Sequence, residues 1–196
     1  KVTVHDAGVD PAGTGSDRTA ADGIALDIIK VGGTAPATYE LLGSRESGHA
    51  LVERTIDMFG RIDILIHNAG LVAFEAIETI DEAHYQSMLD VHVNAPFWLA
   101  QAAMPHMRTQ GYGRIVLTTS GRALNLDGAV PQLSTYNIGK MAQTGLMNAL
   151  AAEGRDDGIR VNAISPVAAT RMLRRSVEPG TFTPGAGRTR CCLSRL

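Results

Sequence analysis

Three residue types capable of acid–base chemistry occur close together in the middle of the chain. Ser120 ends a run of hydroxyl residues, and Tyr136 and Lys140 follow within a segment whose apolar residues recur at helical spacing. Residues four positions apart lie one above the other on the same face of a helix. The spacing therefore predicts that the phenol of Tyr136 and the ammonium of Lys140 are neighbours.

A phenol beside an ammonium is a usable acid or base. A tyrosine with its ordinary pKa near ~10 rarely exchanges protons at neutral pH. A positive charge one helical turn away favours the phenolate and makes Tyr136 a candidate general acid or base. A serine hydroxyl facing it could bind the substrate oxygen that gains or loses the proton. Such a trio still lacks a hydride carrier.

Hydrophobic periodicity predicts the strands and helices that position these residues. A short β-branched run predicts a buried strand at 114–119, with Ser120 at its carboxyl end. The other predicted strands are 2–6, 37–39, 62–66 and 158–164, and the helices are 20–31, 44–59, a stretch opened by a capping box at 79–82, and 136–150. The run 62–66 fits a parallel strand buried on both faces. Pro96 and Pro105 argue against one straight helix over 82–107.

Several motifs around the trio, taken in order, resemble the short-chain dehydrogenase/reductase family. They are the acid-ended strand 2–6, the segment His67-Asn68-Ala69-Gly70 after a strand, Asn94 within a helix, Ser120, the Tyr136 and Lys140 pair, and the segment 162–166 after a last strand. A set of ordered motifs is far more specific than any one of them. The resemblance implies an α/β fold with a doubly wound, Rossmann-like parallel sheet. It also implies hydride transfer between NAD(P) and a secondary alcohol or ketone, with a 3-hydroxyacyl compound as one candidate substrate.

The resemblance assigns roles to four catalytic residues. Tyr136 would transfer the proton, and Lys140 would support the phenolate and hold the nicotinamide ribose. Ser120 would orient the carbonyl group. Asn94 would sit at a helix irregularity and use its backbone carbonyl to hold a water that leads to the lysine. The alternative is a polar side chain beside a proline bend, and the resemblance favours the functional role.

The connection between Ser120 and Tyr136 is a few residues longer than in most relatives. The extra length falls in 125–134, so we expect it to reshape the substrate pocket. It also leaves Thr119 and Ser134 as alternative hydroxyls. Ser120 is preferred because a residue at a strand end is positioned by rigid structure.

Residues at the predicted strand ends form the expected cofactor site. Asp6 would accept hydrogen bonds from the adenine-ribose hydroxyls and repel a 2′-phosphate, which predicts NAD over NADP, although a plain turn aspartate is the alternative. Glu40 would face the adenine amine or be an exposed loop acid, two readings of equal weight. The remaining cofactor-binding candidates are Asn68, Ala69, Gly70, Tyr136, Lys140, Pro166, Val167 and Thr170. Val167 stands where glycine is usual in the family.

Both ends of the chain depart from the family pattern. Gly13 and Gly15 resemble a phosphate-binding turn, but Arg18 occupies the third glycine position and the turn is too long. The resemblance places the first strand and its glycine-rich loop before Lys1. We therefore expect one partial domain at 1–184, incomplete at both ends, and a disordered tail at 185–196. A frameshift is our hypothesis for the tail, and a coding sequence incompatible with a one-base repair would refute it.

Composition narrows the class of protein. The 196 residues are 44% hydrophobic and 19% charged, which suits a single globular domain. A formal charge of −2 argues against a nucleic-acid surface. No apolar run approaches the ~20 residues of a membrane helix and no signal peptide opens the chain, which predicts a cytoplasmic protein. Cys191 and Cys192 are adjacent, and His67 has no metal-ligand neighbours, so no metal is expected.

These patterns predict an NAD-dependent enzyme acting on a small alcohol or ketone. The resemblance implies a homodimer or homotetramer. A truncated, non-catalytic remnant or binding module is the alternative, because both termini lack elements that a complete enzyme needs while the centre is intact.

Overall fold

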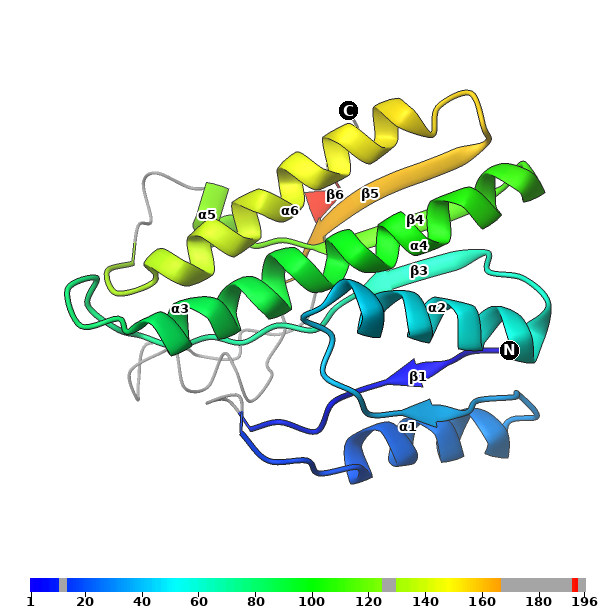
Figure 1. Ribbon diagram of the computed structural model, residues 1–196, viewed down its shortest axis with the longest axis horizontal. Coiled ribbons are helices and arrows are strands. Elements are labelled where there is room, and N and C mark those ends of the chain that lie inside the picture. Colours follow the sequence, from blue (N-terminus) through cyan, green and yellow to red (C-terminus); the bar gives the residue numbers. More distant parts are fainter. Residues whose placement is uncertain (11–13, 125–129, 167–191, 194–196) are drawn as a thin grey trace, which may run out of the picture.

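The computed structural model describes residues 1–10, 14–124, 130–166 and 192–193 (Figure 1). Its first half contains β1 (Val4–His5), α1 (Thr19–Lys30), β2 (Ala37–Thr38), α2 (Arg45–Phe59) and β3 (Ile64–His67). Its second half contains α3 (Glu82–Leu89), the π-helical turn η1 (Asp90–Asn94), α4 (Ala95–Gln110), β4 (Gly113–Thr118), α5 (Gly121–Leu124), α6 (Ser134–Glu153), β5 (Ile159–Ser165) and β6 (Cys192–Leu193). Every predicted strand and helix is present, with bounds shifted by a few residues.

The strands pair mainly in parallel. β3, β4 and β5 lie side by side in that order, with Ile64 opposite Arg114 and Gly113 opposite Ile159. β1 pairs in parallel with β2. Parallel strands joined through helices confirm the predicted α/β fold class. β6 runs antiparallel to β5, so Cys192 and Leu193 form a strand within the expected disordered tail, and the rest of that tail lies outside the described residues.

The sheet is divided between β1 and β3. In the described part of the chain, β1 and β2 form one sheet and β3 to β6 form another. Figure 1 shows β1 and β2 below α2, apart from the larger sheet. The division falls where the family resemblance places the expected first strand.

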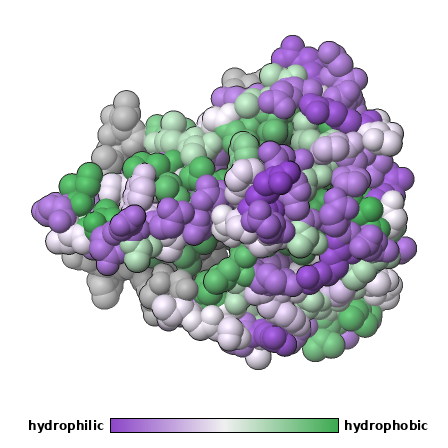
Figure 2. All heavy atoms as spheres, viewed as in Figure 1, coloured by the Kyte–Doolittle hydropathy of each residue, from purple (hydrophilic) through white to green (hydrophobic). Residues whose placement is uncertain are grey.

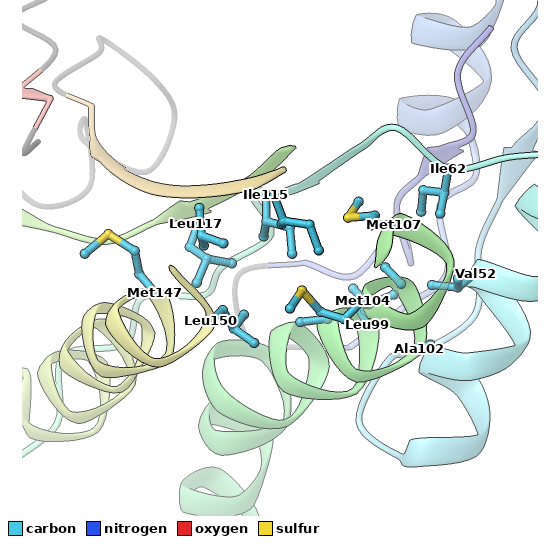
Figure 3. Packing of buried hydrophobic residues seen from close by; sticks show 14 of the residues in the cluster. Val52, Ile62, Leu99, Ala102, Met104, Met107, Ile115, Leu117, Met147 and Leu150 are labelled. Atoms are coloured by element: carbon cyan, nitrogen blue, oxygen red, sulfur yellow. The ribbon is translucent and has the colours of Figure 1, made fainter. Parts of the chain in front are cut away.

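The core lies between one face of the larger sheet and the helices α2, α4 and α6. Ile115 and Leu117 of β4 are fully buried, and Met107 of α4 and Met147 of α6 pack against them (Figure 3). Gly113 is the first residue of β4, and an added Cβ there would lie 2.5 Å from the Met107 sulfur, so this close packing requires glycine.

The other face of β3 is open in the described structure. Ile64 is 56% exposed and Ile66 is 63% exposed. Side chains alternate along a strand, so these two share the face that α2, α4 and α6 do not cover. The prediction of a strand buried on both faces was therefore wrong.

The run from α3 to α4 is helical throughout, and its irregularity is the π-helical turn η1. Pro96 lies in the first turn of α4, and Pro105 lies inside the same helix. Asp81 caps α3 by accepting a hydrogen bond from the His84 backbone at 2.7 Å. The predicted capping box at 79–82 was wrong, because the Thr79 hydroxyl instead donates to the Ala76 carbonyl.

The outer face of the helices is mostly hydrophilic. Figure 2 shows, in the view of Figure 1, hydrophilic residues over most of this face with hydrophobic patches between them. Within the described ranges, no helix combines the length and apolar character that a membrane crossing requires.

Candidate active site

Strand β4 and helix α6 position the predicted catalytic residues. β4 ends at Thr118, so Thr119 and Ser120 follow at its carboxyl end. The Thr119 hydroxyl donates a buried hydrogen bond to the backbone carbonyl of Lys140 at 2.7 Å. This bond fixes the strand end against α6 at the level of Lys140. Because its hydroxyl is occupied, Thr119 is less suited than Ser120 to bind a substrate oxygen.

Lys140 is a buried cation beside Tyr136. It is 4% exposed, and its Nζ donates to the Thr118 carbonyl at 2.6 Å. Burial lowers the pKa of Lys140 to about 8, which leaves most of the amine protonated at neutral pH. Nζ lies 5.7 Å from the centroid of the Tyr136 ring. The structure thus places this pair together, as the four-residue spacing predicts.

Tyr136 lies in mostly apolar surroundings. It is 9% exposed. Its buried neighbours are Met88 and Leu133, and half-buried Leu71, Val72 and Val130 pack against this cluster. A charge interaction is stronger where the effective dielectric constant is low. The arrangement can therefore support proton exchange between the phenol and a substrate oxygen.

Ser120 is half-buried just beyond β4. Its Oγ accepts a hydrogen bond from the Arg122 backbone at 3.3 Å. The Oγ of Ser134 is buried and has no hydrogen-bond partner among the described residues, so this alternative stays open. Half of the predicted pocket-shaping segment, residues 125–129, lies outside the described residues.

The turn after β3 lies beside Thr118 and Lys140. Asn68 Oδ1 accepts a hydrogen bond from the Thr118 hydroxyl at 3.2 Å, which links the ends of β3 and β4. A Cβ added at Gly70 would lie 3.3 Å from Lys140 Nζ. The residue between them, Ala69, is exposed. The structure therefore brings the predicted segment 68–70 next to Lys140.

Asn94 ends the π-helical turn, and its side chain has a local partner. Its Nδ2 donates to Asp90 Oδ1 at 2.7 Å. The carbonyl left without its usual helical donor is that of His92, because Pro96 four residues later has no N–H. Gln143 of α6 donates to this carbonyl at 3.0 Å. Sequence reasoning missed His92, although the proline four residues after it is the signal that could have found it.

A comparison with known families decides what kind of protein carries this site. The family model described as short chain dehydrogenase matches residues 17–179. The chain belongs to the short-chain dehydrogenase family. The predicted family is therefore confirmed, and with it membership of a family of oxidoreductases.

Two curated relatives of this short-chain dehydrogenase are parts of much longer proteins. The chain is 38% identical to the peroxisomal hydratase-dehydrogenase-epimerase of Saccharomyces cerevisiae over 179 residues, which cover 91% of this chain and 19% of that protein. It is 38% identical to peroxisomal multifunctional enzyme type 2 of Mus musculus, covering 87% of this chain and 22% of that protein. The chain spans about a fifth of the length of these two relatives.

Solved structures of related enzymes hold nicotinamide cofactors. NAD⁺-bound xylitol dehydrogenase is 30% identical with a TM-score of 0.75, covering 83% of this chain and 62% of that one. A metagenomic short-chain oxidoreductase in complex with NADP is 26% identical with a TM-score of 0.71, covering 78% and 68%. The fold of this short-chain dehydrogenase is therefore the predicted Rossmann-like one, and a nicotinamide cofactor suits it.

The two acidic cofactor candidates lie at the ends of β1 and β2. Asp6 Oδ1 accepts a hydrogen bond from the Gly8 backbone at 2.8 Å, which forms a turn at the strand end. Glu40 is exposed, and its Oε1 accepts a hydrogen bond from Arg54 at 2.6 Å. Each carboxylate thus has a local partner. The cofactor roles of both residues stay predictions.

The nicotinamide-side candidates are described only in part. Pro166 follows β5, and Ser165 Oγ before it accepts a hydrogen bond from the Gly121 backbone at 2.6 Å. This bond joins the end of β5 to the segment after Ser120. Val167 and Thr170 lie outside the described residues.

Two buried imidazoles, His67 and His92, interact electrostatically with the lysine of this short-chain dehydrogenase. Burial, followed by the Lys140 charge, lowers the pKa of His67 to about 3 and that of His92 to about 4. At neutral pH both rings are uncharged, and Lys140 alone of these three groups carries charge. In the part of the chain that the structure describes, no three His, Cys, Asp or Glu side chains are grouped as a metal site would need.

These imidazoles predict a loss of stability on mild acidification. Below about pH 6.5, His67 and His92 bind protons in the unfolded chain but stay neutral in the folded chain. The free energy of unfolding therefore falls as the pH drops. Each ring contributes a loss of roughly 2 kcal/mol by about pH 5. Urea unfolding at pH 7 and pH 5 measures it.

His67→Asn tests the assignment of this loss. It removes one titrating ring from the interior, so the difference in unfolding free energy between the two pH values should shrink by about 2 kcal/mol. An unchanged difference would show that folding does not lower the pKa of His67.

Proposed function

We propose that this chain is an NAD-dependent oxidoreductase that interconverts a secondary alcohol and a ketone. The observation that carries the proposal is the buried Lys140 ammonium beside the Tyr136 ring, next to the turn at Gly70. When bound, the nicotinamide supplies or accepts the hydride. Tyr136 donates a proton to the carbonyl oxygen in reduction and accepts the hydroxyl proton in oxidation. Ser120 hydrogen-bonds that oxygen, and Lys140 stabilises the phenolate.

The residues beside Gly70 suit a nicotinamide ribose. Gly70 has no side chain, which leaves its backbone accessible beside Lys140. An added Cβ there would lie 3.3 Å from Lys140 Nζ. An ammonium has three donors, and only one is used by the Thr118 carbonyl. On this basis Asn68, Gly70 and Lys140 would hold the ribose hydroxyls. We propose that Asn94 acts in the proton path to Lys140.

We propose a 3-hydroxyacyl thioester as the substrate class. Two features support it: the yeast relative is named a hydratase-dehydrogenase-epimerase, and Leu71, Val72 and Val130 give Tyr136 apolar surroundings. Apolar linings favour acyl chains over polyols.

The proposed reaction is tested by NADH formation with 3-hydroxybutyryl-CoA, using both enantiomers, against xylitol as a polyol control. We expect turnover of one thioester enantiomer and little with xylitol. Turnover of xylitol alone would overturn the substrate class while keeping the reaction. No turnover with any secondary alcohol would overturn the reaction itself.

A non-catalytic binding module is the second candidate. The observation that favours it is the division of the sheet between β1 and β3, in the half expected to bind the cofactor. Titration calorimetry with NAD discriminates the two. Binding supports the enzyme, whereas a folded chain without measurable binding supports the module.

Asp6→Ser is expected to shift cofactor preference toward NADP. A carboxylate at this strand end repels a 2′-phosphate, so its removal should raise the NADP to NAD ratio of kcat/KM about tenfold or more. Asp27→Asn is the matched control, because its carboxylate is exposed on α1 and is paired with Lys30. A ratio unchanged in Asp6→Ser would contradict the role of Asp6.

We further propose a homodimer or homotetramer located in the cytosol. Light scattering on the purified chain measures the assembly, and a monomeric mass would contradict it. Cell fractionation against a peroxisomal marker tests the location, since the two curated relatives are named peroxisomal.

A further inference from the structure

The carboxyl ends of β1 and β2 lie on the same side of the structure as the start of α1 (Figure 1). The Asp6 nitrogen donates to the Thr38 carbonyl at 3.1 Å, so Asp6 lies where both strands end. Gly8 connects this place to α1, because its nitrogen donates to Asp6 Oδ1 and its carbonyl accepts from the Asp17 nitrogen, both at 2.8 Å. The residue after Asp17 is Arg18, which immediately precedes α1. The Arg18 backbone is therefore close to Asp6.

The side chain of Arg18 is stacked on Tyr39, the residue after β2. Its Cζ atom lies 4.7 Å from the centroid of the Tyr39 ring. The Tyr39 hydroxyl donates to Asp22 Oδ1, which holds the ring against the first turn of α1. A guanidinium that stacks on an aromatic ring uses its flat face, and the N–H donors at its edge stay available. Tyr39 thus holds the Arg18 side chain beside the strand ends without occupying its donors.

The charge of Arg18 is not neutralised by an ion pair. Arg18 is exposed, and none of the ion pairs within the described ranges includes it. A second cation near these strand ends, Arg54, is paired with Glu40 at 2.6 Å. Burial lowers the pKa of His5, so this ring is uncharged at neutral pH. Arg18 therefore remains open to an anionic ligand, in contrast to Arg54.

An exposed carboxylate and an unpaired guanidinium at this place favour different cofactors. A carboxylate at the end of this strand binds the adenine-ribose hydroxyls and repels a 2′-phosphate. A nearby arginine accommodates that phosphate, because its planar fork of N–H donors matches the phosphate oxygens. Asp6 and Arg18 bring both chemistries to the same strand end.

We propose that Arg18 is a specificity-determining residue of the cofactor site, which binds the 2′-phosphate of NADP and counteracts the repulsion exerted by Asp6. The stacking on Tyr39 reduces the conformational entropy that the Arg18 side chain loses on binding. The inference rests on the nicotinamide-cofactor site of the proposed function, but not on the substrate or on hydride transfer.

Titration calorimetry without substrate tests this role, because NAD and NADP differ only in the 2′-phosphate. The variants are Arg18→Gln, which removes the charge and the fork, and Arg18→Lys, which keeps the charge alone. Each is also combined with Asp6→Ser, so that NADP affinity is measured without the opposing carboxylate. Arg61→Gln is the matched control, because Arg61 is exposed before the amino end of β3 and is paired with Asp63.

In the Asp6→Ser background, Arg18→Gln should weaken NADP binding about tenfold, because a charge-assisted contact with the phosphate is lost. The same loss is expected where Asp6 is present. NAD affinity should stay close to that of the same protein with Arg18. Arg18→Lys should recover part of the loss, and Arg61→Gln should bind both cofactors as the wild type does.

An NADP affinity that Arg18→Gln leaves unchanged in the Asp6→Ser background, or no NADP binding there at all, would overturn the proposal. Equal losses of NAD and NADP affinity would also overturn it, since Arg18 would then contact a part that the two cofactors share. In these cases, NAD binding by the wild type would leave the proposed function intact. A wild type and an Asp6→Ser variant that bind neither cofactor would overturn the cofactor site and the role of Arg18 together.

Discussion

Tyr136→Phe is expected to lower kcat/KM about a thousandfold, the range in which a general acid or base contributes. The substitution removes only the hydroxyl. The ring still packs with Met88 and Leu133 and still meets the His92 ring edge-on. The fold and NAD affinity should therefore stay close to those of the wild type.

Initial rates of NADH formation with 3-hydroxybutyryl-CoA measure this effect, and titration calorimetry measures NAD affinity. Tyr112→Phe is the matched control, because Tyr112 is partly exposed just before β4, at the end opposite Ser120. It should keep the wild-type rate within about twofold. A Tyr136→Phe variant that keeps more than roughly a tenth of the wild-type rate would place the proton transfer on another group.

Lys140→Met should lower kcat about a hundredfold without unfolding the protein. Methionine fills a similar volume and removes the charge that stabilises the phenolate. Weaker NAD binding is also expected, because a donor to the ribose is lost. The same kinetic and calorimetric measurements test both effects, and a rate near that of the wild type would contradict the role of Lys140.

The pH dependence of the free energy of unfolding tests Lys140→Met independently of catalysis. Burial lowers the pKa of Lys140 from 10.5 to about 8, so between these values the unfolded chain binds the proton that the folded chain has lost. The wild-type free energy of unfolding should therefore rise through this window, by roughly 3 kcal/mol in total. In Lys140→Met this rise should be absent.

At neutral pH, Lys140→Met removes a buried charge, which should raise the free energy of unfolding. It also removes the hydrogen bond to the Thr118 carbonyl, and the unpaired carbonyl offsets part of that rise. Urea unfolding at neutral pH and near pH ~10 measures the change in each protein. Equal pH dependence in the wild type and the variant would show that Lys140 titrates normally.

Local patterns predicted the elements that carry the site. The β-branched run ending at Thr118 and the helical spacing of Tyr136 and Lys140 depend on residues close in sequence, so periodicity was sufficient. The segment at Gly70 was also predicted, because parallel strands bring their carboxyl ends to one edge of a sheet.

Features that depend on distant contacts could not be predicted this way. The exposure of Ile64 and Ile66 depends on which helices cover each face of the sheet. The Thr119 hydroxyl is occupied because α6 lies close enough for it to donate to the Lys140 carbonyl. The burial of His92 depends on how closely α6 packs against the π-helical turn.

The space beside Gly70 has a consequence for how this protein can evolve. Even a methyl group there would press on the His92 ring and on Lys140 Nζ, at 3.0 Å and 3.3 Å. Alanine adds the smallest side chain of any replacement, so we expect no substitution to be tolerated at residue 70, although glycine has no reactive side chain. Lineages that keep catalysis are expected to retain glycine at this position, and lineages that have abandoned catalysis are free to lose it.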